Sequence, residues 1–170
     1  GVAGLSLAPV AFGQITWHVD DGAPPGGDGL SWATAFDDLQ PAMELALAGD
    51  AIWLAEGVYV PSVIDPIAGE DQPYFLMPDG VALLGGFRGD ETVETTRDPG
   101  RFESIISGDL LGNDLDTPVT GRAFSSPEMG ALYQSLLDNT GTLLFVDRTG
   151  LGTVVDGIVF EGAFTERGGQ

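Results

Sequence analysis

The order of apolar and polar positions predicts one short amphipathic helix near the N-terminus. Between positions 36 and 47, apolar residues recur at steps of three and four, as on the buried face of a helix. The residues on this face are Phe36, Leu39, Met43, Ala46 and Leu47. Pro41 is tolerated in the first turn, so Asp37 or Asp38 is the predicted N-cap, and Gly49 stands where the helix is expected to end.

The other apolar runs are short, rich in Val, Ile, Leu and Phe, and bounded by Gly, Asp or Pro, which predicts strands. They cover residues 15–19, 51–55, 58–60, 74–77, 81–87, 103–108, 142–146 and 153–162, with a second short helix near 129–137. Strand starts at Ala51, Val81 and Ser104 lie 30 and 23 residues apart with no helix between them. This spacing favours the coils of a solenoid, and a β-sandwich with longer loops stays open.

Charge and composition narrow the classes of partner. The net charge of −20 arises from 26 acidic and 6 basic residues, so the chain should repel nucleic acid, anionic lipid and polyanionic sugars and attract divalent cations. A solvated surface suited to a salty or extracellular setting explains the same excess. There is no Cys, and His18 is the only His, which excludes disulfides, thiolate sites and a Ser-His-Asp triad within one chain.

The N-terminal segment predicts export. Residues 1–13 are small, apolar and uncharged and end in Ala11-Phe12-Gly13, which fits a signal-peptidase site before Gln14. The alternative is a buried first strand. No later apolar run approaches the roughly 18 residues that span a bilayer. We therefore expect residues 1–13 to be a signal-peptide remnant and the mature chain to be secreted or bound at the cell surface, without membrane insertion.

Several linked sequence motifs carry a family resemblance. They are DGLSWATAFDDLQPAMELALAGDAIWLAEGVYVP, FLMPDGVALLGGFRGDET, RDPGRFESIISGDLLGND and TVVDGIVFEGAF. Together they resemble the N-terminal part of secreted bacterial right-handed parallel β-helix proteins of the pectin-lyase-like superfamily. The resemblance covers residues 15 to about 116 and returns at 153–164. It implies an all-β fold over residues 14–170, a right-handed parallel β-helix (solenoid) with a short N-terminal capping α-helix, incomplete at its C-terminus.

This capping arrangement assigns roles to the residues around the helix. An uncovered β-helix end exposes apolar side chains and unpaired backbone groups, so Phe36, Leu39, Met43 and Leu47 would supply an apolar lid. Gly49 would take a left-handed conformation, and Asp50 would accept turn hydrogen bonds. Alternation puts Ile52 and Leu54 inside and Trp53 outside, beneath the N-terminal strand. Gly85-Gly86 and Gly108 would mark tight corners.

An acidic loop is the strongest candidate metal site. Its oxygen-bearing side chains lie within eight positions and are Asp109, Asn113, Asp114 and Asp116. Ca²⁺ prefers six to eight oxygen ligands on a flexible loop, so this segment predicts a calcium site, although a solvated turn has the same composition. Asp20, Asp21 and Asp28 form a weaker second candidate.

We expect a structural, adhesive or carbohydrate-binding role with no catalysis in this segment. Trp17, Trp32 and Trp53 either stack on sugar rings or pack in the core. The expected partners are an extracellular polysaccharide or cell-surface component, and a second copy at the uncapped C-terminal end. The alternative, implied by the superfamily, is the N-terminal part of a polysaccharide lyase or glycoside hydrolase, for which no catalytic residue can be assigned here.

Overall fold

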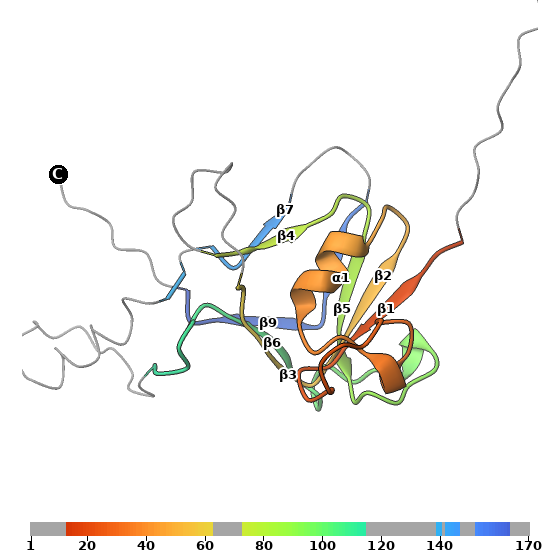
Figure 1. Ribbon diagram of the computed structural model, residues 1–170, viewed down its shortest axis with the longest axis horizontal. Coiled ribbons are helices and arrows are strands. Elements are labelled where there is room, and N and C mark those ends of the chain that lie inside the picture. The colour runs from red at the N-terminus through yellow and green to blue at the C-terminus, as the bar shows by residue number, and fades with distance from the viewer. Residues whose placement is uncertain (1–12, 63–72, 115–138, 141, 147–151, 164–170) are drawn as a thin grey trace, which may run out of the picture.

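The computed structural model describes residues 13–62, 73–114, 139–140, 142–146 and 152–163. Over this part of the chain the protein is mostly sheet with little helix, and all its strand pairs are parallel (Figure 1). The predicted β class is therefore confirmed. The first N-terminal residues and the predicted helix near 129–137 lie outside the described residues.

The strands form three sheets. The first contains β1 (Thr16–Val19), β2 (Ala51–Ala55), β5 (Ala82–Phe87) and β8 (Val154–Asp156), in that order. The second contains β3 (Gly57–Tyr59), β6 (Ser104–Ser107) and β9 (Ile158–Glu161). The third contains β4 (Phe75–Met77) and β7 (Leu144–Val146). From β2 onwards, the chain enters the first, second and third sheets in the same order on each pass.

Register is maintained between passes. Ala51 pairs with Ala82, which pairs in turn with Val154 in the first sheet. In the second sheet, Val58, Ile105 and Val159 occupy one row across three strands. Because side chains alternate between the two faces of a strand, each row places side chains of the same orientation above one another.

Glycines with a positive φ stand at two notable places, between β8 and β9 and within β5. The predicted strand over 153–162 is wrong as a single element, because Gly157 at φ +70° separates β8 from β9. Gly85 and Gly86 lie within β5 and not at a corner, so that prediction is also wrong. Gly86 has φ +93°, and the pairing of β2 with β5 shifts between Trp53 and Ala55. Gly adopts a positive φ more easily than other residues do. This explains why glycines stand at the break between β8 and β9 and beside the shift in the pairing of β2 with β5.

The helix begins as predicted and ends earlier. Helix α1 covers Leu39–Leu45, and the Asp38 carboxylate caps it by accepting a hydrogen bond from the Gln40 N–H at 2.9 Å. Ala46 is already extended, so the prediction that the helix runs to Gly49 is wrong, although Gly49 has the expected positive φ of 100°. Leu47 consequently leaves the helical face and is 66% exposed, which removes it from the predicted apolar lid.

The main core lies where α1 meets the sheets. Helix α1 contacts β1 and β4, and Figure 1 shows it between the first and third sheets. Its buried residues are Leu39, Ala42 and Met43. As predicted, Ile52 and Leu54 point into this core and are fully buried. Two 3₁₀ turns, η1 (Trp32–Thr34) and η2 (Glu94–Thr96), lie in the connecting loops. None of the described helices is long and apolar enough to cross a bilayer.

Candidate functional site

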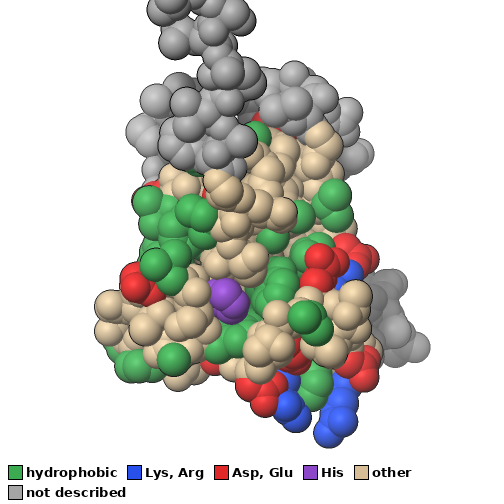
Figure 2. Space-filling model, turned by 90° about the vertical axis from the view of Figure 1, so that its right-hand side faces the viewer, with side chains coloured by type: hydrophobic (Ala, Val, Ile, Leu, Met, Phe, Trp, Pro, Cys, Tyr) green, Lys and Arg blue, Asp and Glu red, His purple; other side chains and the backbone are tan. Residues whose placement is uncertain are grey.

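A groove of about 370 Å³ opens on the outer face of the first sheet, away from the main core. We call it the aromatic groove. Its lining residues are Thr16, His18, Leu30, Ser31, Trp32, Trp53, Glu91 and Thr92. Figure 2 shows the single His, in purple, at the surface beside apolar side chains. The groove joins strand residues from β1 and β2 to loop residues that are far away in the sequence.

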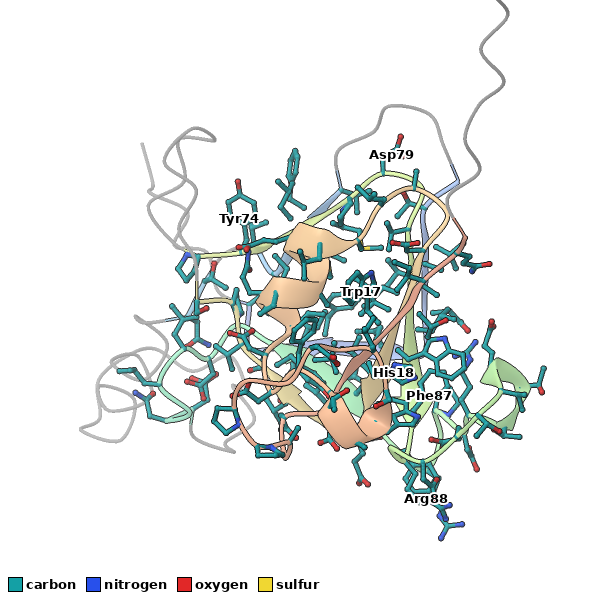
Figure 3. All side chains as sticks on the ribbon, turned by 45° about the vertical axis from the view of Figure 1, so that its right-hand side comes forward. Trp17, His18, Tyr74, Asp79, Phe87 and Arg88 are labelled. Atoms are coloured by element: carbon teal, nitrogen blue, oxygen red, sulfur yellow. The ribbon has the colours of Figure 1, made fainter. Side chains whose placement is uncertain are left out.

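Alternation along β1 positions the strand side of the groove. Trp17 and Val19 are buried in the main core, so Thr16 and His18 point to the opposite face. Figure 3 shows His18 near Phe87 and Trp17 toward α1. His18 pairs in register with Trp53 on β2. Trp53 therefore points outward as predicted, but it lies beside the N-terminal strand and not beneath it, which corrects that part of the prediction.

The loop between β1 and α1 supplies the opposite wall. Two hydrogen bonds hold the backbone of this loop alongside β1. The His18 N–H donates to the Gly29 carbonyl at 2.8 Å, and the Phe36 N–H donates to the His18 carbonyl at 3.0 Å. The Gly29 N–H donates to the Thr34 carbonyl at 2.8 Å and closes the turn around η1. This turn places the Trp32 indole over the outer face of the sheet.

Four aromatic rings pack together at the base of the groove. Trp53 stacks on Phe87 with centroids 4.5 Å apart and planes inclined by 14°. His18 meets Trp32 edge-on at 4.7 Å and Trp53 edge-on at 5.5 Å. Such offset and edge-to-face pairs are the favoured aromatic geometries. Trp53 is only 8% exposed, whereas Trp32 stays partly exposed at the groove surface.

The polar groups of the groove are mostly fixed within the protein. The Trp32 Nε1–H donates to the Glu91 backbone carbonyl at 2.9 Å. The Glu91 carboxylate accepts from the N–H groups of Arg88, Gly89 and Asp90 at 2.8–3.1 Å. Partial burial acts to raise the pKa of Glu91, but these N–H donors outweigh it and lower the pKa. The Trp53 Nε1–H is buried and has no hydrogen-bond partner among the residues that the structure describes.

His18 is held neutral near pH 7. Its Nδ1 lies 3.3 Å from the Gly29 carbonyl oxygen. Burial lowers the pKa of His18 below 6.5, and the carbonyl groups of Gly29 and Thr16 only partly oppose that effect. A neutral imidazole acts here as an aromatic surface with one hydrogen-bond donor and one acceptor.

The predicted acidic loop is only partly described, because Asp116 lies outside the described residues. The Asp109 carboxylate accepts from the Asn113 and Asp114 N–H groups at 3.0 and 2.9 Å. Desolvation acts to raise the pKa of Asp109, and backbone N–H donors nevertheless lower it. Within the described ranges, no group of three or more His, Cys, Asp or Glu side chains is arranged to hold a metal ion.

Asn139 joins this loop, which the sequence did not indicate. Its Nδ2 donates to Asp114 Oδ2 at 2.7 Å and to the Gly162 carbonyl at 2.6 Å. Within the described part of the chain, the other side-chain oxygens of Asp114 and Asn139 are buried and have no hydrogen-bond partner. These two oxygens are of the type that Ca²⁺ binds. The calcium site therefore stays a prediction, and Asn139 is an additional candidate ligand.

The weaker acidic candidate is not assembled into one site. Asp20, Asp21 and Asp28 each accept a hydrogen bond from a different backbone amide. The donors are the N–H groups of Gly22, Val58 and Leu30, respectively. The hydroxyl of Thr34 is the main cause that lowers the pKa of Asp28. The three carboxylates thus stabilise separate turns and loop contacts.

Sequence reasoning named Trp32 and Trp53 as possible sugar-stacking residues but missed the rest of the groove. The alternation of β1 was a usable signal for Thr16 and His18, because their neighbours Trp17 and Val19 are strongly apolar. Glu91 and Thr92 had no such signal, since they reach the groove only through the path of the loop after β5. Comparison with protein families, curated proteins and solved structures gives no match for this chain.

Proposed function

We propose that the chain is a right-handed parallel β-helix whose N-terminal end is covered by α1. The supporting observation is the repeated passage through three parallel sheets, with rows such as Val58, Ile105 and Val159 kept in register. The handedness follows from the strong preference for right-handed crossovers between parallel strands. Helix α1 fits the capping role because its buried face contacts β1 and β4.

The proposed role is that of a secreted or cell-surface binding solenoid that contacts carbohydrate. The aromatic groove carries this proposal, because it combines a partly exposed Trp with hydroxyl-bearing side chains in a preformed hollow. Concave sites with apolar walls and few polar groups are the usual form of small-molecule sites. The proposed solenoid would hold such a site at a fixed position while its other faces serve structural or adhesive contacts.

Retention on polysaccharides tests this role. The chain would be incubated with insoluble cellulose, xylan, mannan, chitin and immobilised polygalacturonate, and the bound fraction would be measured after washing in 0.15 M NaCl. We expect retention on at least one of them and no release of products. Failure to bind any of them would contradict the carbohydrate-binding role, and unsaturated products detected by absorbance would instead indicate a lyase.

We also propose self-association at the end opposite α1. The strands there, β7, β8 and β9, carry exposed apolar side chains. These are Phe145, Val154, Val155, Val159 and Phe160. Among the described residues each of these strands is the last of its sheet, and a strand edge with apolar side chains favours pairing with another copy. Sedimentation velocity over a concentration series should show a monomer–dimer equilibrium that strengthens as salt screens the charge of −20. A monomer at all concentrations and salts would contradict it.

A further inference from the structure

Trp32 is presented to solvent as a rigid platform. Its indole N–H is held by the Glu91 carbonyl at 2.9 Å. Its ring centroid lies 4.7 Å from that of His18 and 5.7 Å from that of Phe87. A side chain that is fixed before binding loses little conformational entropy when a ligand arrives. Trp32 is therefore suited to stack on a flat apolar ligand surface.

The size and the polar rim of the groove indicate a ligand of about one ring. Its volume of about 370 Å³ is near the lower end of the roughly 300–1,000 Å³ typical of ligand sites. Thr16, Ser31 and Thr92 are hydroxyl-bearing residues among those that line the groove. A pyranose ring has a matching surface, because its C–H face is apolar and its edge carries hydroxyl groups.

Charge restricts the ligand further. The residues that line the groove include no Lys or Arg. An anionic sugar would therefore find no cationic partner there, and it would approach against a net charge of −20. The only ionisable lining residues are His18, which burial keeps neutral, and Glu91, whose carboxylate is directed to three backbone N–H groups. Both the lack of a cationic lining residue and the negative net charge therefore disfavour uronate and sulfated sugars.

Trp53 contributes its apolar ring to the same site and not its indole N–H. The side chain lines the groove, but its Nε1 is buried and has no hydrogen-bond partner among the described residues. Because this nitrogen is enclosed by its neighbours, a sugar hydroxyl in the groove would not reach it. The ring of Trp53 therefore supports Trp32 from below, with their centroids 6.4 Å apart.

We infer that the aromatic groove is a subsite for one uncharged pyranose unit of a polysaccharide, with Trp32 as its stacking platform. This inference rests on the carbohydrate-binding role proposed above, and it names the site and the class of sugar. It assigns no chemistry to the groove beyond binding.

Titration calorimetry at pH 7.5 with soluble hexasaccharides tests the inference. The uncharged probes are cellohexaose, xylohexaose, mannohexaose and N-acetylchitohexaose. The charged comparators are hexagalacturonate, an anionic hexasaccharide, and choline, a small cation of the kind that aromatic cages bind. We expect at least one uncharged probe to bind, with little change between 0.05 and 0.5 M NaCl because stacking involves no ion pair. Trp32→Ala should weaken that binding at least about tenfold, and Trp32→Phe should retain part of it.

Phe102→Ala is the matched control, since Phe102 is an aromatic residue that is half-buried, as Trp32 is, and lies outside the groove. It should bind as the wild type does, and circular dichroism should show all three variants folded. Binding of an uncharged probe that survives Trp32→Ala would overturn the groove assignment while leaving the carbohydrate-binding role intact. Preference for hexagalacturonate would overturn the assignment to an uncharged sugar, and preference for choline would overturn the assignment to a sugar. Absence of binding to every sugar would count against both proposals.

Discussion

Asp50 accepts a hydrogen bond from the Trp17 indole, with Nε1 and Oδ2 3.3 Å apart, across 33 residues of sequence. The same carboxylate accepts from the Ile15 N–H at 2.9 Å and the Leu47 N–H at 3.0 Å. Asp50 is only 7% exposed. It thus connects the start of β1, the end of the α1 region and the start of β2 at a single buried group.

Replacing this carboxylate should destabilise the covered end of the molecule. Asp50→Ala leaves three donors without their acceptor, and the loss of a buried partner costs about 1–3 kcal/mol or more when the group is charged. We expect a loss of about 3 kcal/mol in the free energy of unfolding, measured by urea denaturation. Asp37→Ala, which removes an exposed carboxylate just before α1, should change it by less than about 0.5 kcal/mol. Equal effects of the two substitutions would show that the Asp50 contacts are unimportant.

Close packing between successive passes should make Gly85 irreplaceable by Ala. A Cβ at Gly85 would lie 2.3 Å from the Gly157 carbonyl oxygen and 2.9 Å from the Ser104 Cβ. Gly157 lies at the junction of β8 and β9, and Ser104 belongs to β6, so neither can move aside easily. We therefore expect Gly85→Ala to cost about 2 kcal/mol or more in the free energy of unfolding. Gly152→Ala is the control, since its Cβ would meet nothing within 4 Å. Thermal unfolding should separate the two variants, and a Gly85→Ala protein as stable as the control would contradict the packing.

Much of the architecture could be predicted from local pattern. The strand over residues 51–55, the inward direction of Ile52 and Leu54, and the cap at Asp38 all follow from side-chain period and from proline chemistry. The end of α1 could not be predicted, because Ala46 and Leu47 continue the apolar period. In the structure, Leu47 lies in a turn where its N–H donates to Asp50. That contact depends on tertiary structure and is invisible to a helical pattern.

The groove was harder to predict than the fold for a related reason. Its Trp residues are compatible with either core or surface, and the choice depends on which loops cover the outer face of the first sheet. Trp53 is covered by the ring of Trp32, which comes from η1, 21 positions earlier in the sequence. Glu91 then fixes Trp32 from a third segment. The sequence alone does not indicate which residues of different loops will come into contact.

The lowered pKa of His18 predicts a loss of stability on mild acidification. The unfolded chain takes up a proton near pH 6.5, whereas burial delays protonation in the folded state. The His18 contribution to stability is therefore complete above pH 6.5 and declines as pH falls toward the lower folded pKa. Because His18 is partly solvated, we expect a fall of at most about 1 kcal/mol between pH 7.5 and 5. The stability of His18→Phe, measured by denaturation, should not show this fall. A pH dependence identical to that of the wild type would contradict the role of His18.

Calcium gives a separate prediction for the acidic loop. If Asp114 and Asn139 use their unpaired oxygens to bind Ca²⁺, millimolar CaCl₂ should raise the Tm and EDTA should reverse the rise. Asn139→Leu should remove the response, whereas Asp37→Asn, a change at an exposed carboxylate far along the chain, should keep it. A Tm that is the same in CaCl₂ and EDTA would eliminate the calcium hypothesis.

The central claim is that successive passes of the chain stack in parallel and in register, and engineered disulfides test it most directly. The sequence has no Cys, so each introduced pair is the only one that can cross-link. Ile105 pairs with Val159, and Val58 is one strand further away on the other side of Ile105. Neighbouring strands are about 4.8 Å apart, within the roughly 7 Å limit for a disulfide, whereas strands two apart are about 10 Å apart.

Oxidation of each purified double variant, followed by non-reducing electrophoresis and thiol titration, is the measurement. We predict that Ile105→Cys with Val159→Cys forms an intramolecular disulfide rapidly and nearly completely, and that Val58→Cys with Val159→Cys does not. Failure of the first pair to cross-link, or equally rapid cross-linking of the second, would contradict the parallel, in-register stacking on which the β-helix proposal depends.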